Sequence, residues 1–388
     1  MTGLLPFIQL VSRSTPNLNV AAVTTLIDRW RPETHRFHLR TGEMIVTLQD
    51  VSMITALPVE GKPLCMSTDS EGWRQQMEAL IGMSPHEPEV EDGGKKDRVP
   101  AGAPFTWIAA NFAHWPEDAD DEVIQRYARV YMWYVISRTI FADGTGKNAP
   151  WMWLKALTVF DNKFSWGSAA LAYLYRQLDD ACRRTTKDGG VGGCMLLLSV
   201  EWQPYGAGPN FGYAHTFEIN PLCVQEKHLW LMCCPLICNW AVEFHLPHRV
   251  MHQFGFFQPH PPEWVDTDTQ LHRLDRRRQR KIKDWHKHHK SYVIMFEQSV
   301  QTTSRIQRTQ YRQHCPLAFN NYLRWFQEST RVQICPPAYE EDILEELTEY
   351  TALAQGDYNK LICEGYQTSF ALVLNFVVSV LTYVKYEC

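Results

Sequence analysis

The densest run of like charge in the chain lies between residues 273 and 290, which read RLDRRRQRKIKDWHKHHK. Arginine and lysine at this density are the groups that neutralise nucleic-acid phosphates, and Trp285 and Tyr292 are aromatic groups on which bases could stack. The predicted contacts with nucleic acid or a partner are Arg273, Arg276, Arg277, Arg278, Arg280, Lys281 and Lys283. A solvated basic helix face that pairs with the acidic segment 340–349 is nevertheless favoured over a role in binding nucleic acid.

Thiols and imidazoles come closest together between residues 233 and 252. A structural zinc site needs four such ligands in a tetrahedral arrangement, and its cysteines are commonly spaced as C-x2-C. This stretch lacks the C-x2-C pair and is rich in Trp and Leu, so a buried thiol cluster is favoured over a metal site. The weak metal candidates are Cys234, Cys238, His245 and His248.

Motifs that would identify an enzyme are incomplete. The segment Gly144 to Lys147 is similar to a phosphate loop, but Phe141 stands where the first glycine is needed and Asn148 where Ser or Thr is needed. We also find no zinc-protease, nucleophile-elbow or dinucleotide-binding motif. The sequence therefore predicts no catalytic residue and no cofactor, and a non-enzymatic protein is favoured while an enzyme stays the alternative.

Apolar residues at helical spacing dominate the chain and predict the elements that must position these groups. Helices are predicted over residues 17–31, 47–57, 121–141, 168–182 and 339–352. Thr47 and Asp50 have the spacing of a capping box at the start of the second helix. Residues 37–47 alternate around Thr41 and Gly42, which predicts a short hairpin. The predicted fold class is mainly α, a multi-helix globular domain with a minor β-hairpin near the N-terminus.

Two segments stand apart from this pattern. Residues 84–104 are polar and rich in Pro and Gly, which predicts a flexible loop. Residues 370–384 are mostly apolar, but they are shorter than the roughly 20 residues that span a bilayer. A buried helix or strand, or a divergent end that is not part of the ancestral fold, is therefore favoured over a membrane anchor, and we expect no membrane partner.

The amino-acid composition excludes several classes of protein. Of 388 residues, 45% are hydrophobic and 21% are charged, which is typical of a folded globular protein and excludes a disordered chain or a collagen. The net charge of −5 means that any binding of nucleic acid must be local. The 11 cysteines lack the density and spacing of a secreted disulfide framework, which indicates reduced thiols in the cytosol or nucleus.

Several sequence segments, called family strings below, together resemble one family, the plant mobile domain, also labelled aminotransferase-like. They lie at residues 26–39, 42–58, 165–178, 242–255, 271–292 and 322–325. The family includes proteins similar to the maintenance-of-meristems proteins and to the long-form homologues of plant serine/threonine phosphatase seven. The resemblance implies a nuclear protein that acts with a phosphatase-like partner in meristem maintenance, silencing of transposable elements and control of gene expression.

The same resemblance predicts where the domain begins and ends and which enzymatic activities are not implied. It implies a plant mobile domain over residues 1–350 and a divergent tail over residues 351–388. No phosphatase domain is present in the chain, so phosphatase activity is not implied. A pyridoxal-phosphate aminotransferase needs a Schiff-base lysine and an acidic partner for the pyridine nitrogen, and we can nominate neither.

Polar residues within the family strings are the predicted site. One group surrounds a predicted helix end and contains Arg29, Arg31, Glu33 and His35. The second is a single arginine on an apolar helix, Arg176. The third has helix-like spacing in an apolar stretch and contains Glu243, His245, Arg249 and Gln253. For the first group a structural role is favoured over partner binding.

Two classes of function follow. The favoured one is a non-enzymatic nuclear interaction module, and the alternative is a transposon-derived enzyme or a protein that binds DNA or RNA through residues 273–290. An enzyme should have a concave pocket with converging acidic or histidine side chains, whereas a module should have an exposed aromatic or basic patch.

Overall fold

The computed structural model describes residues 3–13, 20–86, 101–114, 116–143, 146–183, 191–198, 221–262, 282–305 and 311–330. The predicted helix over residues 339–352, the tail over residues 351–388 and most of the basic run lie outside these ranges. Within them the fold is mainly α, as predicted.

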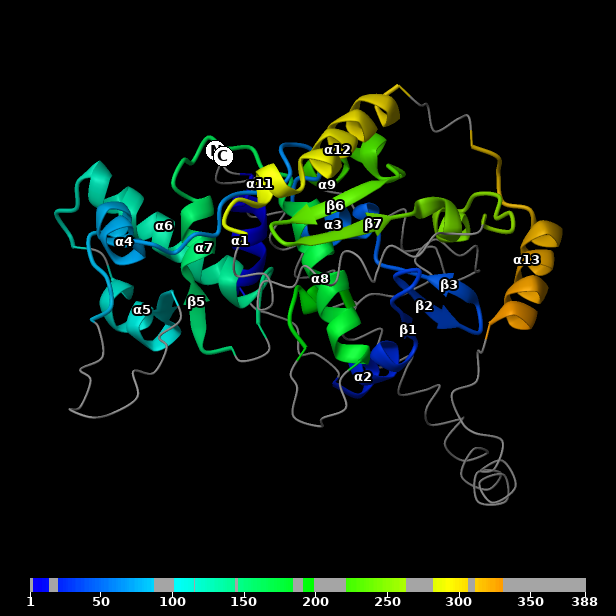
Figure 1. Ribbon diagram of the computed structural model, residues 1–388, viewed down its shortest axis with the longest axis horizontal. Coiled ribbons are helices and arrows are strands. Elements are labelled where there is room, and N and C mark those ends of the chain that lie inside the picture. Colours follow the sequence, from blue (N-terminus) through cyan, green and yellow to red (C-terminus); the bar gives the residue numbers. More distant parts are fainter. Residues whose placement is uncertain are drawn as a thin grey trace, which may run out of the picture.

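Helix α8 (Trp166–Cys182) runs through the middle of the molecule (Figure 1). Its side chains are apolar almost all round and nearly all of them are buried, which is typical of a helix enclosed by other elements rather than lying on a surface. Arg176 and Asp179 are the charged exceptions among its buried residues. Any polar group on this helix therefore needs a partner from a neighbouring element.

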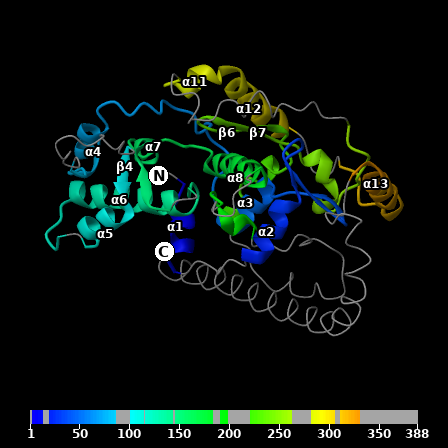
Figure 2. The same ribbon diagram turned by 60° about the horizontal axis from the view of Figure 1, so that its bottom comes forward.

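A hairpin and a helix are layered on one side of α8. Strands β6 (Cys234–Cys238) and β7 (Ala241–His245) pair antiparallel with Leu236 opposite Glu243, and Figure 2 shows α12 (Lys290–Thr303) lying over them. Successive side chains of a strand point to opposite faces. Glu243 consequently reaches α8, while the ring of Phe244 contacts Tyr292 on α12 at 6.3 Å between centroids.

The N-terminal unit packs against α8 as well. Helix α2 (Val20–Asp28) leads into strands β1 (Trp30–Arg31), β2 (Arg36–Leu39) and β3 (Gly42–Met44), and α3 (Leu48–Thr55) follows. Strands β2 and β3 pair antiparallel within the range of the predicted hairpin, and β1 adds to them, so the region is a three-stranded sheet rather than a hairpin alone. The capping box of Thr47 and Asp50 is present at the start of α3.

A second group of helices lies at one end of the molecule (Figure 1). It contains α4 (Trp73–Ile81), α5 (Phe105–Phe112), α6 (Asp121–Arg138) and α7 (Trp151–Ala156) with the strands β4 (Gly102–Pro104) and β5 (Asn148–Pro150). Helix α1 (Leu5–Arg13) contacts both α3 and α6. Because residues 102–104 pair with β5, the flexible loop predicted over residues 84–104 ends before Gly102.

Short helices complete the described fold. They are η1 (Met195–Leu198), α9 (Pro221–Val224), η3 (Lys227–Leu229), η4 (Pro247–Phe254) and α11 (Trp285–His288), with the longer α13 (Pro316–Ser329) beside β3. Among the described residues, none of these helices combines the length and the apolar character that crossing a bilayer requires.

Candidate functional site

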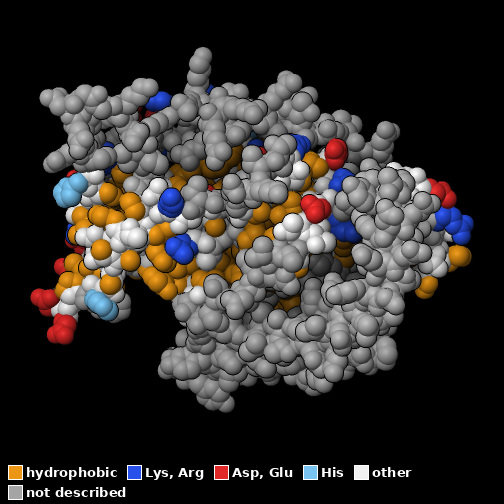
Figure 3. All heavy atoms as spheres, turned by 90° about the horizontal axis from the view of Figure 1, so that it is seen from below, with side chains coloured by type: hydrophobic (Ala, Val, Ile, Leu, Met, Phe, Trp, Pro, Cys, Tyr) orange, Lys and Arg blue, Asp and Glu red, His pale blue; other side chains and the backbone are white. Residues whose placement is uncertain are grey.

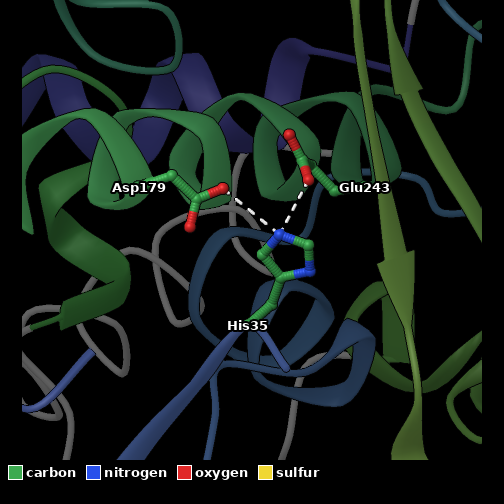
Figure 4. A group of neighbouring side chains, drawn as sticks. All are labelled: His35, Asp179 and Glu243. Carbon is green, nitrogen blue, oxygen red and sulfur yellow. Dashed lines mark hydrogen bonds and ion pairs between the residues drawn. The ribbon is translucent and has the colours of Figure 1, made fainter. Parts of the chain in front are cut away.

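Two carboxylates converge on one histidine beside α8. The Nε2 atom of His35 lies 3.2 Å from Oδ2 of Asp179 and 2.9 Å from Oε2 of Glu243. Figure 4 shows the three side chains pointing at one another from the turn between β1 and β2, from α8 and from β7. The exposed fraction is 5% for His35 and 0% for both carboxylates, so the group is closed to solvent.

The second oxygen of each carboxylate is held by a different donor. Trp30 donates its Nε1–H to Oδ1 of Asp179 at 2.5 Å, and Arg176 donates its Nε–H to Oε1 of Glu243 at 2.6 Å. The terminal Nη1 and Nη2 atoms of Arg176 have no hydrogen-bond partner within the described part of the chain. We call these five side chains, Trp30, His35, Arg176, Asp179 and Glu243, the central network.

The electrostatics of the central network stabilise a charged histidine. Burial alone would lower the pKa of His35, but the charges of Asp179 and Glu243 and the hydrogen bonds to both outweigh it and raise the pKa to about 9. His35 also has a φ of 53°, a left-handed conformation that is uncommon for a residue other than glycine. The turn between β1 and β2 thus holds the imidazole against both carboxylates.

A second buried ion pair lies at the other end of the three-stranded sheet. Arg249 on η4 donates from Nε and Nη2 to the two carboxylate oxygens of Glu43 on β3, at 2.8 and 2.5 Å. The hydroxyl of Tyr322 on α13 accepts the backbone N–H of Glu43 at 2.9 Å. This pair therefore joins β3, η4 and α13, three elements that are far apart in the sequence.

Polar side chains from β7 and η4 hold the backbone of the segment that leads into α3. Gln253 accepts the N–H of Ile45 and donates to its carbonyl, both at 2.9 Å. His245 donates from Nδ1 to the carbonyl of Met232 at 2.6 Å, and its Nε2 accepts the N–H of Leu48. Burial lowers the pKa of His245 to about 3, so the ring is neutral in this role.

The structure brings together only part of the predicted polar set. His35, Arg176 and Glu243 meet in the central network, while His245, Arg249 and Gln253 make the separate contacts just described. Arg29 and Arg31 are half-buried at the edge of the sheet and Glu33 is exposed, so these three stay outside the network. Helix-like spacing was the wrong guide here, because residues 241–245 form a strand.

Sequence reasoning missed Asp179 and Glu43, which are two of the three buried carboxylates among the described residues. Asp179 follows Arg176 by three residues on an otherwise apolar helix, and residues three apart share a helix face. That spacing could have identified it. Glu43 carries no such signal, because it lies in a short strand whose burial depends on η4 and α13.

The weak metal candidates are dispersed. Cys234 and Cys238 lie four residues apart on β6, His245 is paired with Cys234 across the hairpin, and His248 lies on η4. Burial raises the pKa of both thiols well above the usual value, which keeps them protonated. Within the described residues the metal-ligating side chains that do converge are His35, Asp179 and Glu243, whose ligand atoms lie within 4.8 Å of one another.

Of the basic run, only Lys283 among the seven predicted contacts is described. Its Nζ lies 2.9 Å from Asp69 and 3.5 Å from Glu71, and the side chain is exposed. Arg273, Arg276, Arg277, Arg278, Arg280 and Lys281 lie outside the described residues. At its described end, therefore, the run pairs with acidic groups of the same chain.

An open pocket of about 380 Å³ lies between η4, α12 and the segment before β6. Leu231, Cys233, Met251, Met295 and Tyr311 contribute to its wall, and none of the described residues that line it is Lys, Arg, Asp or Glu. His248 also lines it, and burial lowers the pKa of that ring. We call this feature the α12 pocket.

Comparison with known proteins places the chain in a family. It matches the plant mobile domain over residues 6–200 and 198–327. The chain belongs to the plant mobile domain family. The matched ranges include every residue of the central network and of the Glu43–Arg249 pair.

Three relatives from Arabidopsis thaliana illustrate the likeness. The chain is 29% identical to "Serine/threonine-protein phosphatase 7 long form homolog" across 82% of its own length and 27% of that protein. It is 35% identical to "Protein MAIN-LIKE 2" across 49% of its own length and 27% of that protein. It is also 35% identical to "Protein MAINTENANCE OF MERISTEMS" across 47% of its own length and 36% of that protein. The chain thus spans well under two thirds of each of these relatives. No solved structure matches it.

Proposed function

We propose that this plant mobile domain is a non-enzymatic interaction module that acts in the nucleus, in meristem maintenance, silencing of transposable elements and control of gene expression. The observation that supports the proposal is that the polar side chains of the central network are buried inside the fold. The side chains of the central network are at most 5% exposed, so a substrate could not reach them without a rearrangement of the core. These side chains connect the β1–β2 turn, α8 and β7 to one another, which is a structural role.

The surface, by contrast, offers apolar groups. Ile294 and Met295 on α12 are each 42% exposed, and Met295 extends into the wall of the α12 pocket. Figure 3 shows hydrophobic side chains across much of the described surface on another face. Exposed apolar groups around an uncharged pocket are typical of a protein-binding surface.

The partner that we propose is a phosphatase-like nuclear protein, which presents an uncharged apolar segment to the α12 pocket. The name of one relative, a phosphatase 7 long form homolog, supports the class of partner. The absence of charged lining residues supports the chemistry of the segment. DNA or RNA binding is the second candidate, but the pairing of Lys283 with Asp69 does not favour it.

The test is affinity purification of the tagged chain from plant nuclei, with and without nuclease, followed by mass spectrometry. The phosphatase-like protein should survive nuclease treatment, and Met295→Glu should reduce its recovery by about tenfold or more, because a carboxylate in an apolar interface is strongly unfavourable. Ile124→Glu is the matched control, since Ile124 is 49% exposed on α6, away from the pocket. Loss of every partner on nuclease treatment would instead support nucleic-acid binding.

A further inference from the structure

We propose that His35, Asp179 and Glu243 bind one divalent transition-metal ion, which fastens the β1–β2 turn, α8 and β7 together. Imidazole nitrogen and carboxylate oxygen are the ligands that zinc, manganese and ferrous iron take in proteins. One such ligand atom comes from each of the three residues. This inference stands independently of the proposed interaction function.

The spacing of the ligand atoms fits a coordination sphere. Zinc lies about 2.0–2.2 Å from nitrogen and oxygen ligands. Two neighbouring ligands at that radius are about 3.0 Å apart in an octahedral arrangement and about 3.4 Å apart in a tetrahedral one. The 2.9 Å and 3.2 Å that separate Nε2 of His35 from the two carboxylates match these edges. All three ligand atoms lie within 4.8 Å of one another, so the side chains have to move apart around an ion at their centre.

The surrounding donors have the arrangement of an outer coordination shell. In metal sites the ligating carboxylates are themselves held by hydrogen bonds, which fix their orientation. Trp30 does this for Asp179 and Arg176 does it for Glu243, each through the oxygen that faces away from His35. The oxygens Oδ2 and Oε2 both face Nε2 of His35, as Figure 4 shows.

Arg176 supplies a second observation that points to a bound group. Its side chain is only 4% exposed, yet Nη1 and Nη2 have no hydrogen-bond partner among the residues that the structure describes. Three protein ligands leave at least one coordination position open. A water molecule or small anion bound beside Glu243 would satisfy the Nη1 and Nη2 donors of Arg176, which are otherwise costly to bury.

Charge arithmetic favours an anion there. A divalent ion and Arg176 contribute three positive charges, and Asp179 and Glu243 contribute two negative ones when His35 binds as the neutral ring. One further negative charge, such as hydroxide, would make the group neutral. Without the metal, a proton on His35 takes the central place, so the test must separate a proton from a metal ion.

The experiment uses the whole chain expressed in medium supplemented with Co²⁺, because a buried ion is best acquired during folding. We expect about one equivalent of Co²⁺ to remain after chelator washing and gel filtration. Its visible spectrum should show ligand-field bands without the near-ultraviolet thiolate band that cysteine ligation would add. Wild-type protein that retains no Co²⁺, or shows the thiolate band, would overturn the proposal.

Variants locate the ion. Asp179→Asn and Glu243→Gln should each lower the retained metal by about tenfold, while Asp50→Asn is the matched control, because Asp50 is a partly buried carboxylate and its capping contact with Thr47 can be made by asparagine. Trp30→Phe removes only an outer-shell donor and should weaken binding by about 10–100-fold. Equal retention in all four variants would place the ion elsewhere. If a ligand variant does not fold, the wild-type stoichiometry and spectrum still decide.

Discussion

Single residues contribute most to the stability of this fold where a charged side chain is buried beside its counter-charge. Arg249 and Glu43 form a two-point ion pair at exposed fractions of 6% and 2%, whereas Arg126 and Glu122 form an ion pair on the surface of α6. Removing one member of a buried pair leaves an uncompensated charge in the core, but an exposed pair contributes little because water screens it.

We expect Arg249→Met to lower the free energy of unfolding by about 3–5 kcal/mol, because the carboxylate of Glu43 would then be buried without its partner. Arg126→Met should lower it by less than about 1 kcal/mol. Chemical denaturation of the two variants measures both values. Adding Glu43→Leu to Arg249→Met should recover part of the loss, and a double variant as unstable as the sum of the two single variants would contradict this account.

At the scale of elements, long connections are secured by a few backbone contacts at which two segments meet closely. The N–H of Lys62 donates to the carbonyl of Lys163 at 2.8 Å, and the carbonyl of Lys62 accepts the N–H of Ser165 at 2.8 Å, just before α8 begins. Gly61 makes this approach possible. Its φ is +123°, and a Cβ there would lie 2.6 Å from the carbonyl oxygen of Lys163.

Gly61→Ala should therefore destabilise the protein through both the backbone conformation and the clash with Lys163. The backbone part alone is about 1–3 kcal/mol. Gly255→Ala isolates that part, because Gly255 also has a positive φ, of +73°, but nothing lies within 4 Å of its added Cβ. Thermal or chemical denaturation should show the larger loss for Gly61→Ala. Equal losses would mean that the contact between the two segments can relax freely.

At the scale of the whole molecule, buried neutral histidines make stability depend on pH. Burial lowers the pKa of His38 and of His289 to about 4, whereas an unfolded histidine titrates near 6.5. Between these values the unfolded chain binds protons that the native state does not. The free energy of unfolding should consequently fall as pH is lowered from about 6.5 towards 4, by up to about 1.4 kcal/mol per pH unit for each histidine.

Comparison of variants isolates this effect, because Asp50 has a pKa raised by burial to about 6 and contributes with the opposite sign. His289→Gln should flatten the acid slope measured by denaturation at a series of pH values, while keeping a donor for the Trp240 backbone. His286→Gln, at an exposed position of α11, should leave the slope as it is. Identical slopes for the two variants would contradict the assignment.

The sequence by itself determined the local elements and the family. Residues at helical spacing placed α3, α6 and α8 close to their observed bounds, and the capping box of Thr47 and Asp50 was predicted and is present. The family strings led to the plant mobile domain, which the comparison shows. These signals are readable because helix periodicity and capping depend on residues within a few positions of one another.

Only the tertiary structure decided which charges meet. His35 and Asp179 are 144 residues apart and Glu43 and Arg249 are 206 apart, and no local pattern encodes such a pairing. The stretch that holds Glu243 was assigned helix-like spacing but pairs as β7 under α12, since Val242 and Phe244 favour a strand and β6 supplies its hydrogen-bonding partner. A buried charge is stable only beside its counter-charge, and that neighbour is supplied by the folding of distant segments onto α8.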